Sequence, residues 1–389
     1  MKLNPPLLAL AAGAFGIGVT EFAPMGLLPV IATDLGVSIP TAGLLISAYA
    51  LGVMLGAPLI TLTTGRVPRR TLLIGLAAVF TVGNLLSAVS TDYGMLLAAR
   101  VVTSLNHGAF FGVGSIVAAG LVAPNRQAGA VAAMFMGLTI ANVVGVPLAT
   151  WAGDVLGWRA AFWGIAGIGV AVMAALRLTL PNLPAPTGGH MGAELRVLGR
   201  GPVLAALALT VIGSSTMFTV FTYIAPILRE QTHASLGFVT AMLVTYGVGL
   251  TVGNWLGGRF ADKSVDRTLV VTLASLSALL VAFALAMPFA APTAVLVFLW
   301  GVASFALVPP LQVRVMAAAG DAPNLASAVN IGAFNLGNAI GAALGGAVIA
   351  GGLGYPAVSL AGAVCAGLGL LLVLFLSRRQ GAVQTSAAG

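Results

Sequence analysis

Charged side chains are scarce in this sequence. Lys, Arg, Asp and Glu together make up 7% of its 389 residues, whereas a soluble domain carries about 25%. Hydrophobic residues account for 59% of the chain. This balance excludes a soluble globular protein and predicts a protein that is embedded in a lipid bilayer.

Cysteine and histidine are also rare. Cys365 is the only cysteine, so an intramolecular disulfide and a cysteine metal cluster are excluded. The histidines, His107, His190 and His233, are too widely separated for metal-ligand spacing. The sequence also lacks the phosphate-binding loop of nucleotide hydrolases and the nucleophile motif of serine hydrolases. We therefore expect no metal, no cofactor and no enzymatic reaction.

Long apolar runs are abundant instead. A membrane-spanning helix needs about 20 apolar residues, and twelve runs of roughly that length follow one another along the chain. We expect an all-α integral membrane protein with twelve transmembrane helices. The runs are 6–32, 40–63, 71–89, 94–121, 129–151, 159–180, 202–226, 236–258, 268–288, 293–317, 325–351 and 356–377.

Lys and Arg are unevenly divided between the loops on the two sides of the membrane. With a cytoplasmic N-terminus, 14 of them fall on the cytoplasmic side and only Arg159 and Arg229 on the other. Such an excess is typical of cytoplasmic loops. We expect both termini in the cytoplasm. The net charge of +8 then reflects topology, and we expect no nucleic-acid partner.

The two halves of the sequence repeat each other. A shift of 197 residues lays AYALGVMLGAP, from Ala48, on TYGVGLTVGNW, from Thr245, so that a YxxGxxxG pattern coincides. The same shift carries Arg70 onto Arg267 without a gap. Each half has six predicted spans, an even number, so the two repeats have the same orientation in the membrane. Parallel repeats of this kind are found in transporters that bind substrate near the midplane between two halves.

The segment from Pro181 to Gly201 is the longest connection and is rich in proline and glycine. It divides the chain into three predicted parts. These are an N-terminal six-helix bundle at 1–180, a cytoplasmic linker loop at 181–201, and a C-terminal six-helix bundle with a short cytoplasmic tail at 202–389.

Four segments resemble a known family. They are TEFAPMGLLPVIATDLGVS from Thr20, AGLLISAYALGVMLGAPL from Ala42, ARVVTSLNHGAFFGVGS from Ala99 and ANVVGVPLATWAGDVLGWRAAFW from Ala141. Together they resemble the major facilitator superfamily, and within it the sugar-efflux and chloramphenicol-resistance branch of the twelve-helix drug:proton antiporters. The resemblance implies the major facilitator fold, two six-helix repeats related by a pseudo-two-fold axis, in the inner membrane of a bacterium.

The loop after the second span departs from the family pattern, which reads GxLaDrxGrr. Here it reads TLTTGRVPRR, with Gly65 in place of the acid, whereas the second half keeps that acid as Asp262. We expect gating by salt bridges between the basic loops and Asp262 or Asp266, in addition to a role of the basic residues in topology. The expected gating residues are Arg69, Arg70, Asp262 and Arg267.

Three ionisable residues lie inside apolar spans. Glu21 is the only carboxylate in such a span, and Arg100 and His107 share a helix face because seven residues bring the helix back to within about 20°. Ionisable groups at this depth usually face a cavity and mark an ion or substrate path. We expect Glu21 to carry a proton, Arg100 to favour its ionised form, and His107 to shape the site. Purely structural roles are the alternative for all three residues.

Polar and aromatic residues in other spans are candidates for substrate contact. Amphipathic ligands bind in apolar pockets that contain a few polar groups. Packing and hydrogen bonds between helices explain the same residues equally well. The candidates are Phe22, Met25, Asn106, His107, Phe110, Asn142, Phe218, Phe221, Tyr246, Trp300, Asn330, Phe334 and Asn338.

The sequence therefore favours a secondary exporter that exchanges protons for small amphipathic drugs or sugar-like compounds. A sugar or metabolite transporter, with or without protons, is the first alternative. A membrane receptor that does not transport is the second, but the short loops and tail leave little room for a signalling domain. The absence of a long hydrophilic insertion favours a monomer.

Overall fold

The computed structural model describes residues 4–64, 66–182, 197–320 and 323–387. Within these residues the chain is helical, and twelve helices are long and apolar enough to cross a membrane. This confirms the predicted all-α fold with twelve spans. Gly65 and most of the predicted linker lie outside the described residues.

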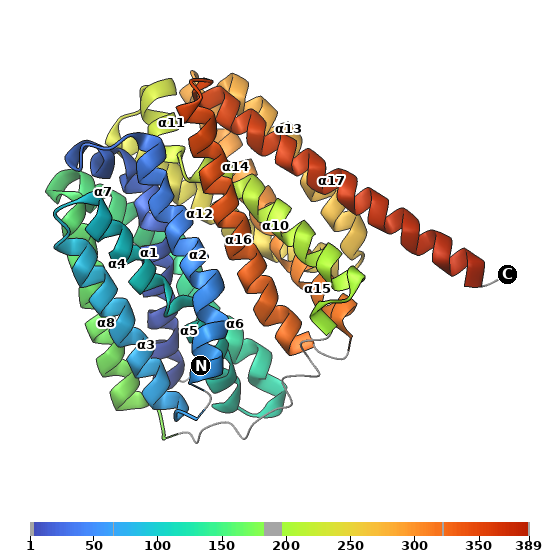
Figure 1. Ribbon diagram of the computed structural model, residues 1–389, viewed down its shortest axis with the longest axis horizontal. Helices are drawn as coiled ribbons and strands as arrows, with labels where there is room; N and C mark the ends of the chain where they lie inside the picture. The colour runs from blue at the N-terminus through green and yellow to red at the C-terminus, as the bar shows by residue number, and fades with distance from the viewer. Residues whose placement is uncertain (1–3, 65, 183–196, 321–322, 388–389) are drawn as a thin grey trace. The chain divides into compact units, whose positions relative to one another are not determined.

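Several spans consist of two consecutive helices, so the described part of the chain has more helices than spans (Figure 1). In the first half they are α1 (Pro5–Asp34), α2 (Ile39–Thr63), α3 (Arg69–Ala88), α4 (Tyr93–Ser104), α5 (His107–Gly120), η1 (Pro124–Arg126), α6 (Gln127–Ile140), η2 (Ala141–Gly145), α7 (Val146–Leu156) and α8 (Trp158–Thr179). In the second half they are α10 (Gly201–Phe221), α11 (Ile224–Gln231), α12 (Leu236–Ala261), α13 (Val265–Ala286), α14 (Ala290–Ala306), α15 (Val308–Ala319), α16 (Pro323–Ala350) and α17 (Gly354–Ala387).

Helix ends are fixed by local side chains. A lipid environment offers no hydrogen-bond partners to the backbone, so each span must satisfy its own N–H and C=O groups. Four of the described helices begin after a residue whose side chain accepts a hydrogen bond from the backbone N–H three residues later. These residues are Ser38, Asp92, Ser235 and Ser264, with distances of 3.2, 2.9, 3.2 and 3.3 Å.

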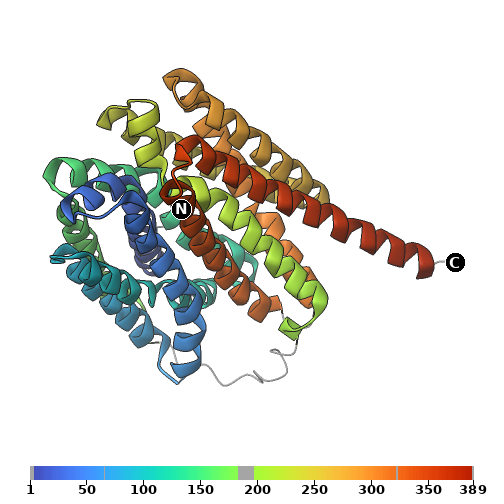
Figure 2. The same cartoon turned by 45° about the horizontal axis from the view of Figure 1, so that its top comes forward.

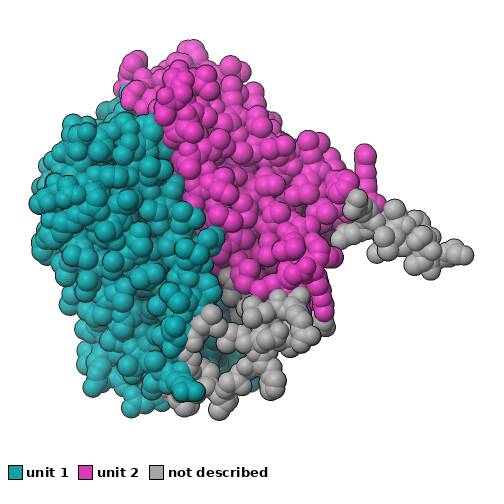
Figure 3. Space-filling model, viewed as in Figure 1, with its two compact units in different colours: residues 1–189, 223–229, 234–244 teal, residues 190–222, 230–233, 245–389 magenta. Residues whose placement is uncertain are grey.

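The chain forms two compact units, which Figure 3 shows in different colours. Unit 1 contains the first six spans together with two short stretches from the seventh and eighth. Unit 2 contains the rest of the second half. Unit 1 comprises residues 1–189, 223–229 and 234–244, and unit 2 comprises residues 190–222, 230–233 and 245–389. The linker predicted at 181–201 remains a prediction, because residues 183–196 are not described.

The first span of each half forms the centre of its unit. In unit 1, α1 packs against α2, α6, α7 and α8. In unit 2, α10 packs against α16 and α17, and Figures 1 and 2 both show these three helices side by side. In each of these two spans 67% of the most apolar window is buried, the highest share among the described spans. A span that is apolar on all sides is suited to this central place.

Glycines of the repeated YxxGxxxG pattern allow the second and fourth spans to pack closely. In α2, a Cβ atom on Gly52 would collide with the side chain of Ser104 in α4. In α12, a Cβ atom on Gly249 would lie 2.6 Å from the carbonyl oxygen of Phe298 in α14. The same position of the repeat therefore makes the same kind of contact in both halves, as expected for small residues between membrane helices.

Candidate functional site

The fourth span is interrupted beside the candidate site. The run 94–121 was expected to be one helix, but α4 ends at Ser104 and α5 begins at His107. The side-chain amide of Asn106 donates a hydrogen bond to the carbonyl oxygen of Thr103. Asparagine side chains compete with the backbone for such acceptors and thereby favour a turn over a continuous helix. Tyr93–Gly120 still forms one span, as predicted, but its hydrogen-bond pattern departs from a regular α-helix at this point.

Four ionisable side chains from four helices of unit 1 meet near this break. They are Glu21 of α1, Tyr49 of α2, Arg100 of α4 and His107 of α5, and each is at most 8% exposed. Oε2 of Glu21 lies 3.9 Å from Nδ1 of His107, and the hydroxyl of Tyr49 lies 3.2 Å from the same nitrogen. A carboxyl and an imidazole are both able to take up and release protons. The arrangement is suited to holding a proton inside the span.

Arg100 is held without a carboxylate partner. Its guanidinium lies over the ring of Tyr49, 4.3 Å from the centroid, a cation–π contact. Its Nη1 donates a hydrogen bond to the hydroxyl of Thr20 at 3.1 Å, and this hydroxyl donates to Oδ1 of Asn84 at 2.6 Å. Nε and Nη2 have no hydrogen-bond partner among the described residues. The positive charge therefore has no neutralising ion pair in the described part of the chain.

The structure brings Arg100 and His107 together, although a turn separates α4 from α5 between them. Both contact Tyr49, which joins their two side chains. The sequence pattern did not single out Tyr49, Thr20 or Asn84 as site residues. The only signals were the place of Tyr49 in the repeat and the polar character of Thr20 and Asn84 within apolar spans. Neither signal separates a functional residue from one that only links helices.

Of these four ionisable groups, the second half keeps only the tyrosine at the corresponding position. Its core here consists of packed aromatic rings. Phe221 and Tyr246 are stacked with centroids 4.4 Å apart, and the ring of Trp300 is tilted against Tyr246 at 4.7 Å. The charged chemistry of the repeat is therefore confined to the first half. The residues that correspond to Glu21, Tyr49, Arg100 and His107 are Phe218, Tyr246, Val297 and Ser304.

The predicted amides are engaged by helices of their own unit. Asn142, at the π-helical turn η2, donates to the carbonyl oxygen of Leu138 at 3.0 Å. Asn338 accepts a hydrogen bond from Ser214 of α10, and Asn330 donates to Gln312 of α15 at 2.7 Å. These contacts fit the expected bonds within and between helices. A further contact of these residues with substrate stays a prediction.

The predicted aromatic and methionine residues are mostly buried. Phe334 alone among them is half-buried, on α16. The structure shows them packed within their own units, and contact with substrate stays a prediction. The buried members are Phe22, Met25 and Phe110 in unit 1, and Phe218, Phe221, Tyr246 and Trp300 in unit 2.

The predicted gating residues have contacts of several kinds. Arg70 donates to the carbonyl oxygen of Arg177 in α8 and, at 2.8 Å, to Oδ1 of Asn182, which follows this helix. In unit 2, Asp266 pairs with Arg314 of α15. Among the described residues, Asp262, Arg69 and Arg267 form no ion pair, so their gating role stays a prediction.

The two basic residues predicted to lie on the sparsely charged side both pair with carboxylates. Nη1 of Arg159 lies 2.6 Å from Oδ2 of Asp34, and Arg159 also donates twice to the carbonyl oxygen of Ser90. Arg229 of α11 pairs with Asp154 of α7. Both ion pairs belong to unit 1. They tie together the ends of α1, α3 and α8 in one case and α7 and α11 in the other.

Comparison with known proteins places this architecture in a family. A sequence model described as the Major Facilitator Superfamily matches residues 10–331 and 207–389. The chain is 57% identical to the inner membrane transport protein YdhP of Escherichia coli over 98% of both chains. It is 35% identical to a chloramphenicol resistance protein of Streptomyces lividans over 98% of both chains. A probable sugar efflux transporter of Helicobacter pylori is 31% identical over 93% of this chain and 92% of that protein.

A solved structure shares the fold. The D-xylose-proton symporter superposes with a TM-score of 0.80 over 95% of this chain and 96% of that one, at 14% sequence identity. The protein belongs to the major facilitator superfamily, as its sequence motifs predicted. It is a multi-pass membrane transporter, and its inner-membrane relative supports the same location.

Proposed function

We propose that this transporter exports a small, uncharged or weakly charged amphipathic compound in exchange for an inward-moving proton. The observation that carries this proposal is the burial of Glu21 beside His107, with Oε2 of Glu21 3.9 Å from Nδ1. A buried carboxylate that serves only structure is normally neutralised by a fixed cation. The neighbour of Glu21 is instead an imidazole, which carries no fixed charge and can accept or donate a hydrogen bond.

The residues of the cluster have distinct roles in this proposal. Glu21 binds the proton on one side of the membrane and releases it on the other, during alternating access. Arg100 stays charged, because guanidinium does not lose its proton in proteins, and its field favours ionised Glu21. His107, oriented by the hydroxyl of Tyr49, is the partner that exchanges hydrogen bonds with Glu21 as its charge changes.

The substrate class follows from the candidate pocket residues and from the relatives. Aromatic and methionine side chains with a few amides suit a compound that has one apolar and one polar part. The relatives include a chloramphenicol resistance protein and a probable sugar efflux transporter. The alternative is a transporter that moves a sugar or metabolite without protons. In that mechanism the Glu21–His107 pair would keep one protonation state during the whole transport cycle.

The proposal is tested with purified protein in liposomes that enclose a pH-sensitive dye. Chloramphenicol-like drugs and pentose or thiogalactoside sugars are added in turn, and the internal pH is recorded. We expect proton movement with at least one compound. In Glu21→Gln the rate of proton movement should fall by about tenfold or more, because a carboxamide neither gains nor loses a proton in this pH range.

The matched control is Glu230→Gln, the same substitution at an exposed position where the carboxylate accepts a hydrogen bond from Tyr355. This variant should transport like the wild-type protein. Equilibration of labelled compound without any pH change would overturn proton exchange and leave a uniporter. Unchanged proton movement in Glu21→Gln would overturn the role of Glu21.

A further inference from the structure

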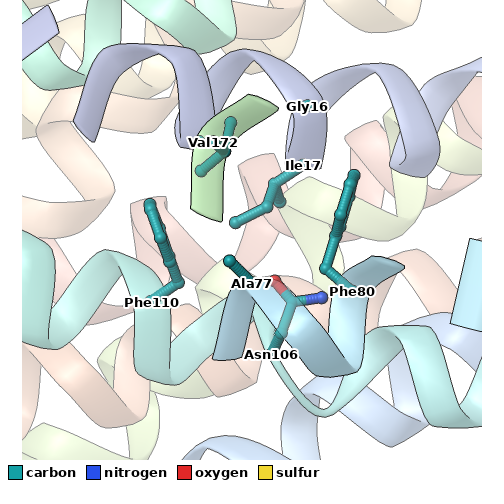
Figure 4. Close-up of a pocket in the computed structure, with 8 residues that line it drawn as sticks. Gly16, Ile17, Ala77, Phe80, Asn106, Phe110 and Val172 are labelled. Carbon is teal, nitrogen blue, oxygen red and sulfur yellow. The ribbon is translucent and has the colours of Figure 1, made fainter. Parts of the chain in front are cut away.

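Unit 1 contains a narrow pocket close to the ionisable cluster. Figure 4 shows its lining residues, which come from α1, α3, α5 and α8 and from the break before α5. The free space suits about one water molecule. Asn106 has the only polar side chain among the lining residues, which include Gly16, Ile17, Phe80 and Phe110.

Asn106 has an unused hydrogen-bond acceptor at this pocket. The residue is 1% exposed, and its amide nitrogen is already bonded to the carbonyl oxygen of Thr103. Its Oδ1 has no partner among the described residues. Figure 4 shows the carboxamide reaching into the space between Phe80 and Phe110. Buried amide oxygens are rarely left unpaired, so a donor from outside the protein is expected here.

The pocket lies one helical turn from the cluster on two different helices. On α1, the lining residue Ile17 precedes Glu21 by four residues, and on α3, Phe80 precedes Asn84 by four. One turn of helix spans 5.4 Å. On the fourth span, Asn106 is the immediate neighbour of His107. The pocket therefore continues the polar cluster toward the N-terminal end of α1.

The chemistry of the lining identifies the occupant as water. A bound calcium or magnesium ion needs about six oxygen ligands, usually with carboxylates, whereas this lining offers one carboxamide oxygen. An apolar ligand would leave Oδ1 of Asn106 unpaired. A water molecule donates one hydrogen to Oδ1 and fits the space.

We propose that the pocket binds an ordered water molecule on Oδ1 of Asn106 and that this water supports proton exchange at the Glu21–His107 pair by hydrating the adjoining end of the cluster. The second part rests on the proposed function. The bound water molecule hydrates the side of the ionisable cluster that faces the N-terminal end of α1.

Hydroxyl-radical footprinting of the intact protein tests the binding site. Radicals formed from bound water label the nearest side chains, which are then located by mass spectrometry. We expect labelling of Phe80 and Phe110, although these rings are only 4% and 1% exposed. Phe162, which is 1% exposed and does not line the pocket, should stay unlabelled.

Two variants remove the water in different ways. Asn106→Leu removes the acceptor, and Gly16→Ala adds a Cβ atom 3.2 Å from the Phe80 ring while keeping Asn106. Each should lower labelling of Phe80 and Phe110 several-fold. Gly167→Ala on α8 is the control, since its Cβ meets nothing within 4 Å. Wild-type labelling no stronger than that of Phe162, or equal labelling in all variants, overturns the site.

The dye-filled liposomes then test the role in proton exchange. We expect Gly16→Ala to slow substrate-driven proton movement several-fold, with Gly167→Ala unchanged. An unchanged rate in Gly16→Ala despite lost labelling would overturn this role while the site itself stands. The labelling result does not depend on transport, so failure of the proposed function is distinguished from failure of the site.

Discussion

Tyr49 contacts two residues of the candidate site with different parts of its side chain. Its ring face lies under the guanidinium of Arg100, and its hydroxyl lies 3.2 Å from Nδ1 of His107. The ring contact stabilises a charge that has no ion-pair partner among the described residues. The hydroxyl contact fixes the imidazole next to Glu21. The two contributions are separable by substitution.

Tyr49→Phe should keep the cation–π contact and lose only the hydrogen bond. We expect a loss of stability of about 1 kcal/mol and a several-fold slower proton-coupled efflux, because His107 is less well oriented. Tyr49→Leu removes both contacts and should cost about 2 kcal/mol or more. Thermal unfolding in detergent measures the stability of both variants, and the liposome assay measures their rate of proton-coupled efflux.

The repeat supplies the control for this comparison. Tyr246 occupies the same repeat position in the second half but packs against Phe221 and Trp300. Tyr246→Phe should leave proton coupling unchanged. Equal stability of Tyr49→Phe and Tyr49→Leu would contradict the assigned ring contact.

Sequence reasoning found the ionisable part of the site but not its neutral part. Glu21, Arg100 and His107 stand out because charge inside an apolar run is rare and costly. Tyr49 does not stand out, because the same residue type at position 246 packs against the rings of Phe221 and Trp300 instead of a cation. Which tyrosine meets a cation depends on the residue opposite it on another helix, and a single sequence does not give that pairing.

At the scale of helices, the apolar runs predicted all twelve spans of the described chain within a few residues. The interruptions within spans were not predicted. The break between α4 and α5 arises when the Asn106 side chain takes the carbonyl oxygen of Thr103, and the π-helical turn η2 lies within the predicted run 129–151. The hydropathy of a segment depends only on how apolar its residues are. It therefore gives no information about local hydrogen bonds that interrupt a helix.

Glycine packing between spans yields a second test. In α12, a Cβ atom on Gly253 would collide with the backbone of Val302 in α14, which has no flexible end to move aside. Gly253→Ala should therefore destabilise the protein by about 1–3 kcal/mol through overpacking. Gly258 lies on the same helix with nothing within 4 Å of its Cβ position.

Gly258→Ala should be neutral or slightly stabilising, because alanine favours the helix. Thermal unfolding of the two variants side by side measures the difference. Similar melting temperatures for both would mean that the glycines of α12 are not needed for close approach to α14.

At the scale of the whole molecule, the distribution of Lys and Arg predicts that both termini lie in the cytoplasm. This orientation is tested in a Cys365→Ser background, which has no other cysteine. Thr91→Cys and Gly201→Cys introduce exposed thiols at two loops that are predicted to lie on opposite sides of the membrane. A membrane-impermeant maleimide is then applied to intact cells.

We expect labelling of Thr91→Cys in intact cells, since Thr91 lies beside Ser90, the acceptor of the Arg159 hydrogen bonds. Gly201→Cys should be labelled only after the membrane is permeabilised. The reverse pattern would invert the topology and the direction of proton movement that the proposal assigns.

The coupling role of Glu21 is the central claim, and it is tested most directly by separating net transport from exchange in the same liposomes. With a substrate from the dye screen, one arm measures proton-driven accumulation, and the other measures exchange of labelled for unlabelled substrate without a gradient. Glu21→Gln should lose accumulation by at least about tenfold yet keep exchange, because the binding step survives without a titrating carboxyl. Accumulation at the wild-type level in Glu21→Gln, with exchange also intact, would contradict the claim.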